Sequence, residues 1–449
     1  MAVKTTFLKH QAEEIELIHN KSYWALLFEC GTGKTLTTLG IIDRRKQRFP
    51  NYKTLVALPN TLIENWVEEV AKHTDLTCVM LRGTLEKRIK LLNTKADLYL
   101  INYEALRIIT EELINAKFDL VVFDESQNIK ERSTQQSKAA FRIAMACPHR
   151  LILTGTPIHN GPLDCFGQFR VLSPDIFGTS YYRFRSTYAV MGGFLGKMVL
   201  KYINMDKFKR TIMKCSSLRL KDEVLDLPPR TYEVIRLDLP AEQKRMYTQL
   251  RDAFMTECKG SIITAPVVLT RLIRFSQLTA GFYKDIQFQE VSCEQNPKQE
   301  WLIEWLKEHG HKTVVFVRFI KELKDLEGRL TKEGIKFVSI YGETKDRIEQ
   351  VRLFNSDDTF RVFIGQLDTA GQGINLQSAS YCVFLSNNYS YGDREQAESR
   401  IHRQGQKALN CTYIDVIYRD TIDEKVLKIL KKKESLAAII NKGYLREVV

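Results

Sequence analysis

The segment Phe28–Thr35, which ends in the letters GTGKT, constrains this chain more than any other feature. It lies between the apolar run Tyr23–Phe28 and a helix expected to begin near Thr35. Glycines let successive backbone N–H groups face one anion, and the positive end of the helix dipole points at the same place. The pattern predicts a phosphate-binding loop, although Phe28 replaces the first glycine of GxxxxGK[ST]. The expected nucleotide-binding residues of the loop are Gly31, Thr32, Gly33, Lys34 and Thr35. Lys34 is expected to reach the outer phosphates, and the Thr35 hydroxyl is expected to bind Mg²⁺.

The chain has 449 residues, which predicts two or three domains. Its net charge is +13, which indicates a polyanionic partner such as nucleic acid or, alternatively, a solvated basic surface. None of the nine cysteines forms a CxxC pair, so structural zinc is disfavoured. No apolar run approaches the length of a membrane span and no secretory signal is present. We therefore expect no membrane partner and a cytoplasmic location, near the nucleoid of a bacterial or virus-infected cell, or a nuclear one in a eukaryote.

Apolar runs alternate with helix-like segments in both halves of the chain, which predicts an α/β fold with parallel sheets. The expected strands of the first half are 25–29, 54–58, 98–101, 120–123 and 151–153. Those of the second half are 313–317, 337–340, 362–365, 381–385 and 412–417. The paired prolines at Leu227–Arg230 mark a boundary. The expected parts are an N-terminal lobe at 1–228 with a basic segment near its end, a connecting, mostly helical insertion at 229–295, and a C-terminal lobe at 296–449 that closes with a helix over 422–440.

The segment Val121–Gln127 is an apolar strand that ends in two carboxylates. Ligands of open parallel sheets bind where strands end. Asp124 is therefore predicted to hold Mg²⁺, and Glu125 to orient and deprotonate an attacking water. The alternative is an acidic turn after a buried strand.

Two further segments carry candidate chemistry. Leu151–Asn160 is a strand that runs into a TGTP turn, whose Thr154 and Thr156 hydroxyls are expected to sense the γ-phosphate. In the segment Arg394–Gln406, Arg400 and Arg403 are three residues apart and are expected to share one helical face. Two guanidiniums placed across a domain cleft would neutralise a phosphoryl group in transfer, whereas a solvated basic helix is the alternative.

These motifs, in this order, resemble those of the SWI/SNF-family DNA translocases of helicase superfamily two, in particular compact bacterial and bacteriophage members. The resemblance runs almost end to end. It implies two RecA-like lobes, ATP and Mg²⁺ as cofactors, and Lys34, Asp124, Glu125, Arg400 and Arg403 as catalytic residues. Where the family reads DEAH, this chain has Ser126 and Gln127 in the last two places. Gln127 can still hydrogen-bond to the TGTP segment and is expected to couple the two motifs.

The same resemblance implies further contacts. Gln11, in the segment 6–11, is the expected adenine contact, and Gly373 in the segment 367–377 is expected near the nucleotide. The implied nucleic-acid contacts are Pro59, Asn60, Asn65, Tyr103 and Thr369. The family's usual acidic Trp-Asn-Pro stretch is replaced by Ser386–Ser390, which leaves any contact there undefined.

The sequence therefore predicts an ATPase that is stimulated by DNA and moves along double-stranded DNA as a monomeric motor. It leaves two alternatives open. One is a helicase that separates the strands of DNA or RNA, and the other is a nucleic-acid scaffold without catalysis. Direction, pathway and protein partners are not predicted.

Overall fold

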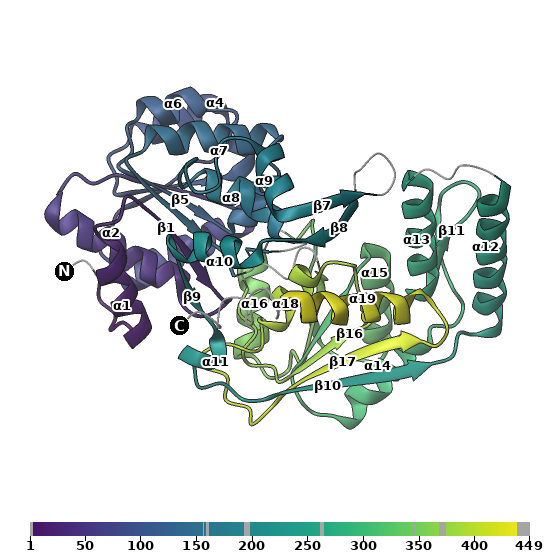
Figure 1. Ribbon diagram of the computed structural model, residues 1–449. Coiled ribbons are helices and arrows are strands. Elements are labelled where there is room, and N and C mark those ends of the chain that lie inside the picture. The colour runs from purple at the N-terminus through teal and green to yellow at the C-terminus, as the bar shows by residue number, and fades with distance from the viewer. Residues whose placement is uncertain are drawn as a thin grey trace. The chain divides into compact units, whose positions relative to one another are not determined.

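The computed structural model describes residues 3–155, 157–158, 161–192, 198–260, 265–344, 346–367 and 374–437. It contains two compact units, of which the first runs to Leu225 and the second spans Asp226–Glu434 (Figure 1). Each unit has one parallel sheet with helices packed on it, so the predicted α/β class with two parallel-sheet lobes is confirmed.

The sheet of the first unit has seven strands in the order β3-β4-β2-β5-β6-β1-β9, all parallel. Its strands are β1 Tyr23–Phe28, β2 Thr54–Leu58, β3 Cys78–Met80, β4 Leu98–Asn102, β5 Leu120–Asp124, β6 His149–Leu153 and β9 Ser216–Arg219. Alternate residues face opposite sides of the sheet, so Leu55 and Val121 pack in one apolar layer and Val56 and Val122 in the other. Because the strands are parallel, the residues after β1, β2, β5 and β6 meet at one edge.

The connections of the first unit are mostly helical. Its helices are α1 Lys9–Ile18, α2 Lys34–Arg48, η1 Asn60–Leu62, α3 Ile63–His73, α4 Leu85–Leu92, α5 Tyr103–Leu106, α6 Thr110–Asn115, η2 Ser126–Ile129, α7 Gln135–Ala146, η3 Pro162–Asp164, α8 Cys165–Arg170, α9 Tyr181–Tyr188, α10 Met205–Met213 and α11 Lys221–Val224. Helix α3 shows why they form, since Ile63, Trp66 and Val70 recur at helical spacing and are all buried. An antiparallel pair, β7 Ala189–Gly192 and β8 Met198–Tyr202, interrupts the alternation.

The sheet of the second unit has six parallel strands in the order β10-β17-β16-β13-β15-β14. They are β10 Arg230–Leu237, β13 Thr313–Val317, β14 Phe337–Ile340, β15 Val362–Gln366, β16 Tyr381–Phe384 and β17 Cys411–Tyr418. The first strand of this unit, β10, pairs over its full length with the last, β17. Residues 229–295, expected from the sequence as a mostly helical insertion, thus contribute an edge strand to this sheet.

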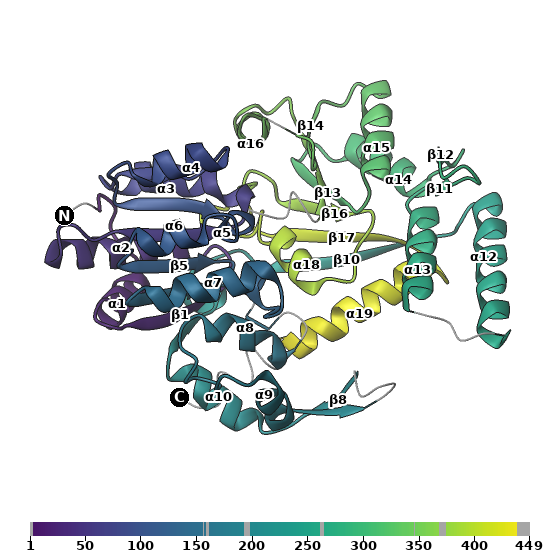
Figure 2. The ribbon, with the colours of Figure 1, turned by 90° about the horizontal axis from the view of Figure 1, so that it is seen from above.

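The helices of the second unit are α12 Ala241–Gly260, α13 Ala265–Thr279, α14 Pro297–Glu308, α15 Ile320–Lys332, α16 Arg347–Ser356, α18 Tyr391–Glu398 and α19 Ile422–Ala437. A small antiparallel hairpin, β11 Phe282–Lys284 and β12 Glu290–Ser292, follows α13 and lies beside it (Figure 2). Asn296 caps the start of α14 by accepting a hydrogen bond from the Gln299 N–H, and Pro297 occupies its first turn.

Candidate nucleotide and nucleic-acid site

The loop between β1 and α2 has the backbone that phosphate binding requires. Gly31 and Gly33 both have positive φ angles, 91° and 90°, a conformation that glycine adopts without cost. Thr32 closes the turn, because its N–H and its hydroxyl both donate to the Glu29 carbonyl, at 3.2 and 2.8 Å. Helix α2 begins at Lys34, directly after the loop. The free N–H groups at this helix start therefore lie at the edge of the sheet where a phosphate would be bound.

Helix α1 packs directly on this loop. His10 Nε2 is 2.9 Å from the Thr32 carbonyl oxygen. A Cβ atom placed on Gly33 would lie only 2.0 Å from Gln11 Nε2, so the Gln11 amide touches the loop itself. The Gln11 side chain is 3% exposed, and its Oε1 accepts a hydrogen bond from the Leu8 N–H at 2.9 Å. Gln11 thus packs against the loop and supports it. The contact expected between Gln11 and adenine stays a prediction.

The ionisable groups expected at the site come together at the ends of β1 and β5. Lys34 Nζ donates to the Phe28 carbonyl at 3.0 Å. The buried Asp124 carboxylate accepts from Trp66 Nε1 at 2.8 Å and from the Glu125 N–H at 2.9 Å. Burial, followed by the neighbouring Glu125 carboxylate, raises the pKa of Asp124 to about 6, while Lys34 acts in the opposite direction.

This environment fits a bound Mg²⁺. Asp124 is a buried carboxylate whose ionised form is disfavoured by burial and by a second carboxylate, so a cation would relieve both effects. Carboxylate and hydroxyl oxygens are the donors that Mg²⁺ prefers, and Thr35 supplies a hydroxyl two residues after Gly33. Asp124 and Thr35 are therefore the residues that would hold it.

Glu125 has an unusual backbone conformation, and its side chain lies at the end of a chain of hydrogen bonds. Its φ is +50°, which non-glycine residues rarely adopt. Its Oε2 accepts from Gln127 Nε2 at 2.7 Å, and Gln127 Oε1 accepts from Thr154 Oγ1 at 2.9 Å. The hydrogen bond predicted between Gln127 and the TGTP segment is thus present. Thr156, the second coupling residue expected there, lies outside the described residues.

Ser126, which replaces a residue of the usual family motif, is also used. Its hydroxyl donates to Gln168 Oε1 at 2.8 Å in the core, and Gln168 Nε2 donates to the Pro157 carbonyl at 2.8 Å. Gln168 is fully buried. This second connection between the carboxylate segment and the TGTP segment was not predicted, since no local pattern marks Gln168.

One predicted nucleic-acid contact is wrong. Tyr103 is 1% exposed, and its hydroxyl donates to the Asp124 carbonyl at 2.7 Å, so the ring belongs to the core and supports the carboxylate strand. Pro59 and Asn65 are half-buried and Asn60 is exposed, at the start of η1 and in α3. Thr369 and Gly373 lie outside the described residues.

A shallow hollow adjoins Asn60 at the carboxyl ends of β2 and β4. It is lined by Asn60, Arg82, Gly83, Arg88, Asn102 and Glu104. Burial and the nearby Arg82 guanidinium lower the pKa of Arg88, so two cations lie close together here. Sequence reasoning missed both arginines because neither lies in a recognisable motif.

In the second unit, Arg400 and Arg403 do not share a helical face as predicted. Helix α18 ends at Glu398; the Ser399 hydroxyl donates to the Gln396 carbonyl at 2.7 Å, and the chain then turns. The two arginines nevertheless converge, since the Nη1 atoms of both reach the Ile374 carbonyl, at 3.2 and 3.5 Å. A turn, rather than a helix, brings them together.

The arginine-bearing turn is fixed by polar groups around it. His402 Nε2 is 2.9 Å from the Pro228 carbonyl, and Arg230 Nε lies 3.2 Å from His402 Nδ1. Arg394, fully buried, donates to both carboxylate oxygens of Asp415, at 2.6 and 3.0 Å, and to Glu398 at 2.7 Å. These bonds hold α18 and the following turn against β10 and β17.

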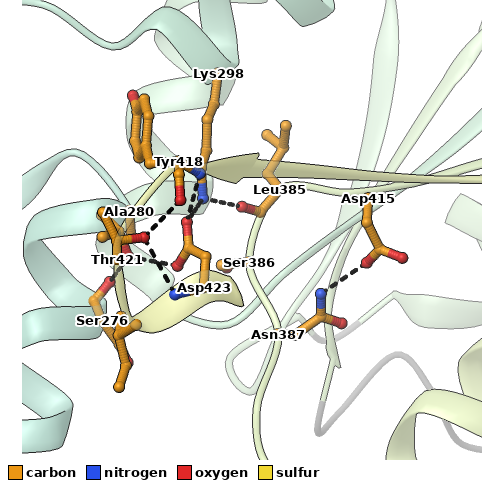
Figure 3. Close-up of polar contacts among 12 residues, drawn as sticks. Ser276, Ala280, Lys298, Leu385, Ser386, Asn387, Asp415, Tyr418, Thr421 and Asp423 are labelled. Atoms are coloured by element: carbon orange, nitrogen blue, oxygen red, sulfur yellow. Dashed lines mark hydrogen bonds and ion pairs between the residues drawn. The ribbon is translucent and has the colours of Figure 1, made fainter. Parts of the chain in front are cut away.

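Asn387 joins this network, and a second group of polar contacts lies where α13, α14 and α19 meet (Figure 3). Asn387 Nδ2 donates to Asp415 at 2.9 Å. Lys298, 2% exposed at its side chain, pairs with Asp423 at 2.7 Å and donates to the Leu385 carbonyl at 2.8 Å. The Ser386–Ser390 segment, which departs from the family pattern, is therefore built into the support of the second unit.

No group of three or more His, Cys, Asp or Glu side chains among the described residues is arranged to hold a metal ion. None of the helices in the described ranges combines the length and apolar character needed to cross a membrane.

Comparison with known proteins gives a consistent result. The family described as SNF2-related domain matches residues 17–284, and the family described as helicase conserved C-terminal domain matches residues 297–405. The chain is 26% identical over 439 residues to the DNA annealing helicase and endonuclease ZRANB3 of Bos taurus, covering 90% of this chain and 38% of that protein. It is 25% identical to an uncharacterized ATP-dependent helicase of Mycoplasma pneumoniae, covering 97% of this chain and 42% of the relative.

The chain thus spans about two fifths of the length of these relatives. Among solved structures, the Sulfolobus solfataricus SWI2/SNF2 ATPase core in complex with dsDNA is similar at 24% identity and a TM-score of 0.48, covering 99% of this chain and 95% of that one.

Proposed function

Because this chain belongs to the SNF2-related family, we propose that it is a DNA-stimulated ATPase that moves along double-stranded DNA. The single observation that carries the proposal is the grouping of Lys34, Asp124 and Glu125 beside a loop with two left-handed glycines. The relatives named as helicases are consistent with it.

In this proposal the loop N–H groups and Lys34 bind the phosphates of ATP, and Thr35 and Asp124 hold Mg²⁺. When bound, the metal would neutralise charge that develops on the phosphates. Glu125 orients the attacking water and accepts its proton. Its position is set by Gln127, which in turn is fixed by Thr154. A change at the TGTP segment would therefore reach the water-activating carboxylate through two hydrogen bonds.

Arg400 and Arg403 are proposed to complete the neutralisation of the transferring phosphoryl group. Their convergence on one carbonyl means that both guanidiniums move together with the turn that carries them. The Arg82–Arg88 hollow and Asn60 are proposed as contacts to the DNA backbone, since phosphate contacts need cations and amides but no base recognition.

The first test compares ATP hydrolysis with and without duplex DNA. Stimulation by duplex is expected, and its absence would contradict the proposal. Movement is read separately, by displacement of a third strand from duplex DNA in the presence of ATP. A protein that hydrolyses ATP but displaces no third strand is not a translocase.

Substitutions at the proposed catalytic residues test the role of each residue in ATP hydrolysis. Glu125→Gln is expected to abolish hydrolysis while ATP binding persists, and Glu131→Gln, the same change on an exposed turn, serves as its matched control. Arg400→Lys is expected to lower turnover by about 10³-fold or more without loss of ATP binding. Full activity of Glu125→Gln would refute its assignment as the base.

A further inference from the structure

The hairpin of β11 and β12 carries two apolar side chains into solvent. Its tip is the five-residue turn 285–289. Within it, Ile286 is 96% exposed and Phe288 is 71% exposed. What sets this turn apart is that two large apolar residues this exposed lie within five residues of each other and contribute nothing to the described core.

The tip is closed by hydrogen bonds and contains one strained residue. One carboxylate oxygen of Asp285 accepts from the N–H groups of Gln287 and Gln289, both at 2.8 Å, and the Asp285 N–H donates to the Gln289 carbonyl at 3.0 Å. Phe288 has a φ of +62°, a conformation that costs free energy for any residue with a Cβ atom and that glycine adopts freely. A phenylalanine is thus kept at a position that the turn itself would prefer to fill with glycine.

The base of the hairpin is fixed to the second unit. Phe282 is 1% exposed and meets the edge of the Phe319 ring, with 5.4 Å between centroids. Beyond β12, the Cys293 N–H donates to the Gly281 carbonyl at 2.8 Å. The Ser292 hydroxyl donates to Asp325 of α15 at 2.9 Å. The base of the hairpin is therefore anchored to α15 and to the residue that precedes it.

The surroundings of the tip favour a nucleic acid. Arg274 of α13 lies over the Phe288 ring, 6.0 Å from its centroid, and the only hydrogen bond found for it among the described residues is to Gln277 at 3.4 Å. Lys284 and Glu290 are paired with each other, and Asp285 is used by the turn, so the charge left available is positive. Residues 241–279, which precede the hairpin, contain six basic and three acidic residues.

The small apolar surface of the tip also favours a nucleic acid over a protein as its partner. Two side chains offer far less surface than the roughly 800 Å² per partner of a stable protein–protein interface. They are, however, sufficient to stack on a base or to enter a base step, since aromatic and aliphatic wedges next to arginine do both.

We propose that this hairpin is a wedge that places Phe288, supported by Ile286, against the last base pair at a fork or junction in DNA. The inference rests on the proposed function, because it assumes a motor that brings the tip to the DNA. It assigns to the chain a strand-opening element in addition to the ATP site.

The test uses the full chain and two DNA probes, a blunt duplex and a fork of the same sequence with the fluorescent base 2-aminopurine at the junction. Emission of this base rises when it becomes unstacked. The wild-type protein is expected to prefer the fork and to raise the emission. Phe288→Gly removes the ring and relieves the strained φ, so it is expected to fold at least as well while its preference for the fork falls by about 5- to 150-fold. Leu409→Ala, at a residue that is 93% exposed elsewhere in the second unit, is the matched control and is expected to change neither quantity.

The outcomes separate the wedge from the motor. The wedge proposal would be overturned if Phe288→Gly kept the fork preference, the emission and the duplex-stimulated hydrolysis of the wild type. That result would point to a protein contact at the tip. Absence of duplex-stimulated hydrolysis in the wild type would overturn the proposed function instead. Loss of fork preference with hydrolysis on blunt duplex retained is the result expected if both hold.

Discussion

The contact between Gln11 and Gly33 predicts a measurable non-additivity. Gly33→Ala imposes a left-handed conformation on a residue with a Cβ atom, which costs about 1–2 kcal/mol. The new Cβ would also lie 2.0 Å from Gln11 Nε2 and expel that side chain, which breaks its bond to the Leu8 N–H, worth about 1 kcal/mol. We therefore expect a total loss of about 2–3 kcal/mol.

Gln11→Ala alone loses the same hydrogen bond and is expected to cost about 1 kcal/mol. In the double variant that bond can be lost only once and the clash is absent. The double variant is thus expected to be about 1 kcal/mol more stable than the sum of the single changes implies, the signature of residues in direct contact.

The free energy of unfolding is measured by chemical denaturation of the full chain. Trp24 and Trp66 report on the first unit, and Trp301→Phe with Trp305→Phe removes the tryptophans of the second unit. Additivity within about 0.3 kcal/mol would refute the packing of Gln11 on the phosphate loop. A Gly33→Ala variant as stable as the wild type would refute the left-handed backbone at that position.

Three further outcomes are expected. Thr154→Val removes the donor to Gln127 and is expected to lower kcat about 3- to 10-fold with an unchanged KM for ATP. Thr154→Ser keeps the hydroxyl and is expected to keep the wild-type kcat. An equal loss in both variants would contradict the coupling of Thr154 to Glu125 through Gln127. Burial raises the pKa of Glu322 to about 7 from 4.5, so the folded state is penalised increasingly as pH rises through this interval. Glu322→Gln is therefore expected to gain up to about 3 kcal/mol over the wild type between pH 5 and pH 8 in urea unfolding, and a constant difference would count against a buried, protonated Glu322. Lys298→Met leaves the Asp423 carboxylate buried without its ammonium partner and is expected to lower the free energy of unfolding by about 3–5 kcal/mol. The double variant Lys298→Met/Asp423→Leu should recover most of this loss. An unchanged stability of the single variant would contradict the ion pair.

The sheets were predictable from the sequence because buried parallel strands are continuous apolar runs. All ten strands predicted from such runs are present, with ends that differ by two residues or fewer. β3, β9 and β10 were missed because they lie at sheet edges, where exposed or half-buried positions interrupt the run, as Tyr232 shows at 50% exposure. The short antiparallel hairpins were missed for a similar reason, since their strands are only three to five residues long.

The site was predictable as far as its motifs extend. Lys34, Asp124, Glu125 and Gln127 lie where the strand-end argument placed them. Their supports were not predictable, because Gln168 and Tyr103 act through contacts made by the folded chain and no spacing in the sequence encodes them. The helical arrangement predicted for Arg400 and Arg403 was wrong, since the helix ends at Glu398 and a turn carries the arginines.

The pairing of β10 with β17 has a consequence for the order of synthesis. The seven strands of the first sheet are all available once residue 219 has left the ribosome. β10, in contrast, emerges about 180 residues before its only partner in the sheet. At about 5–20 residues per second, it waits roughly 10–40 s with its backbone groups unpaired. A nascent chain of this protein therefore needs protection during that interval, most of all when translation slows between these two strands.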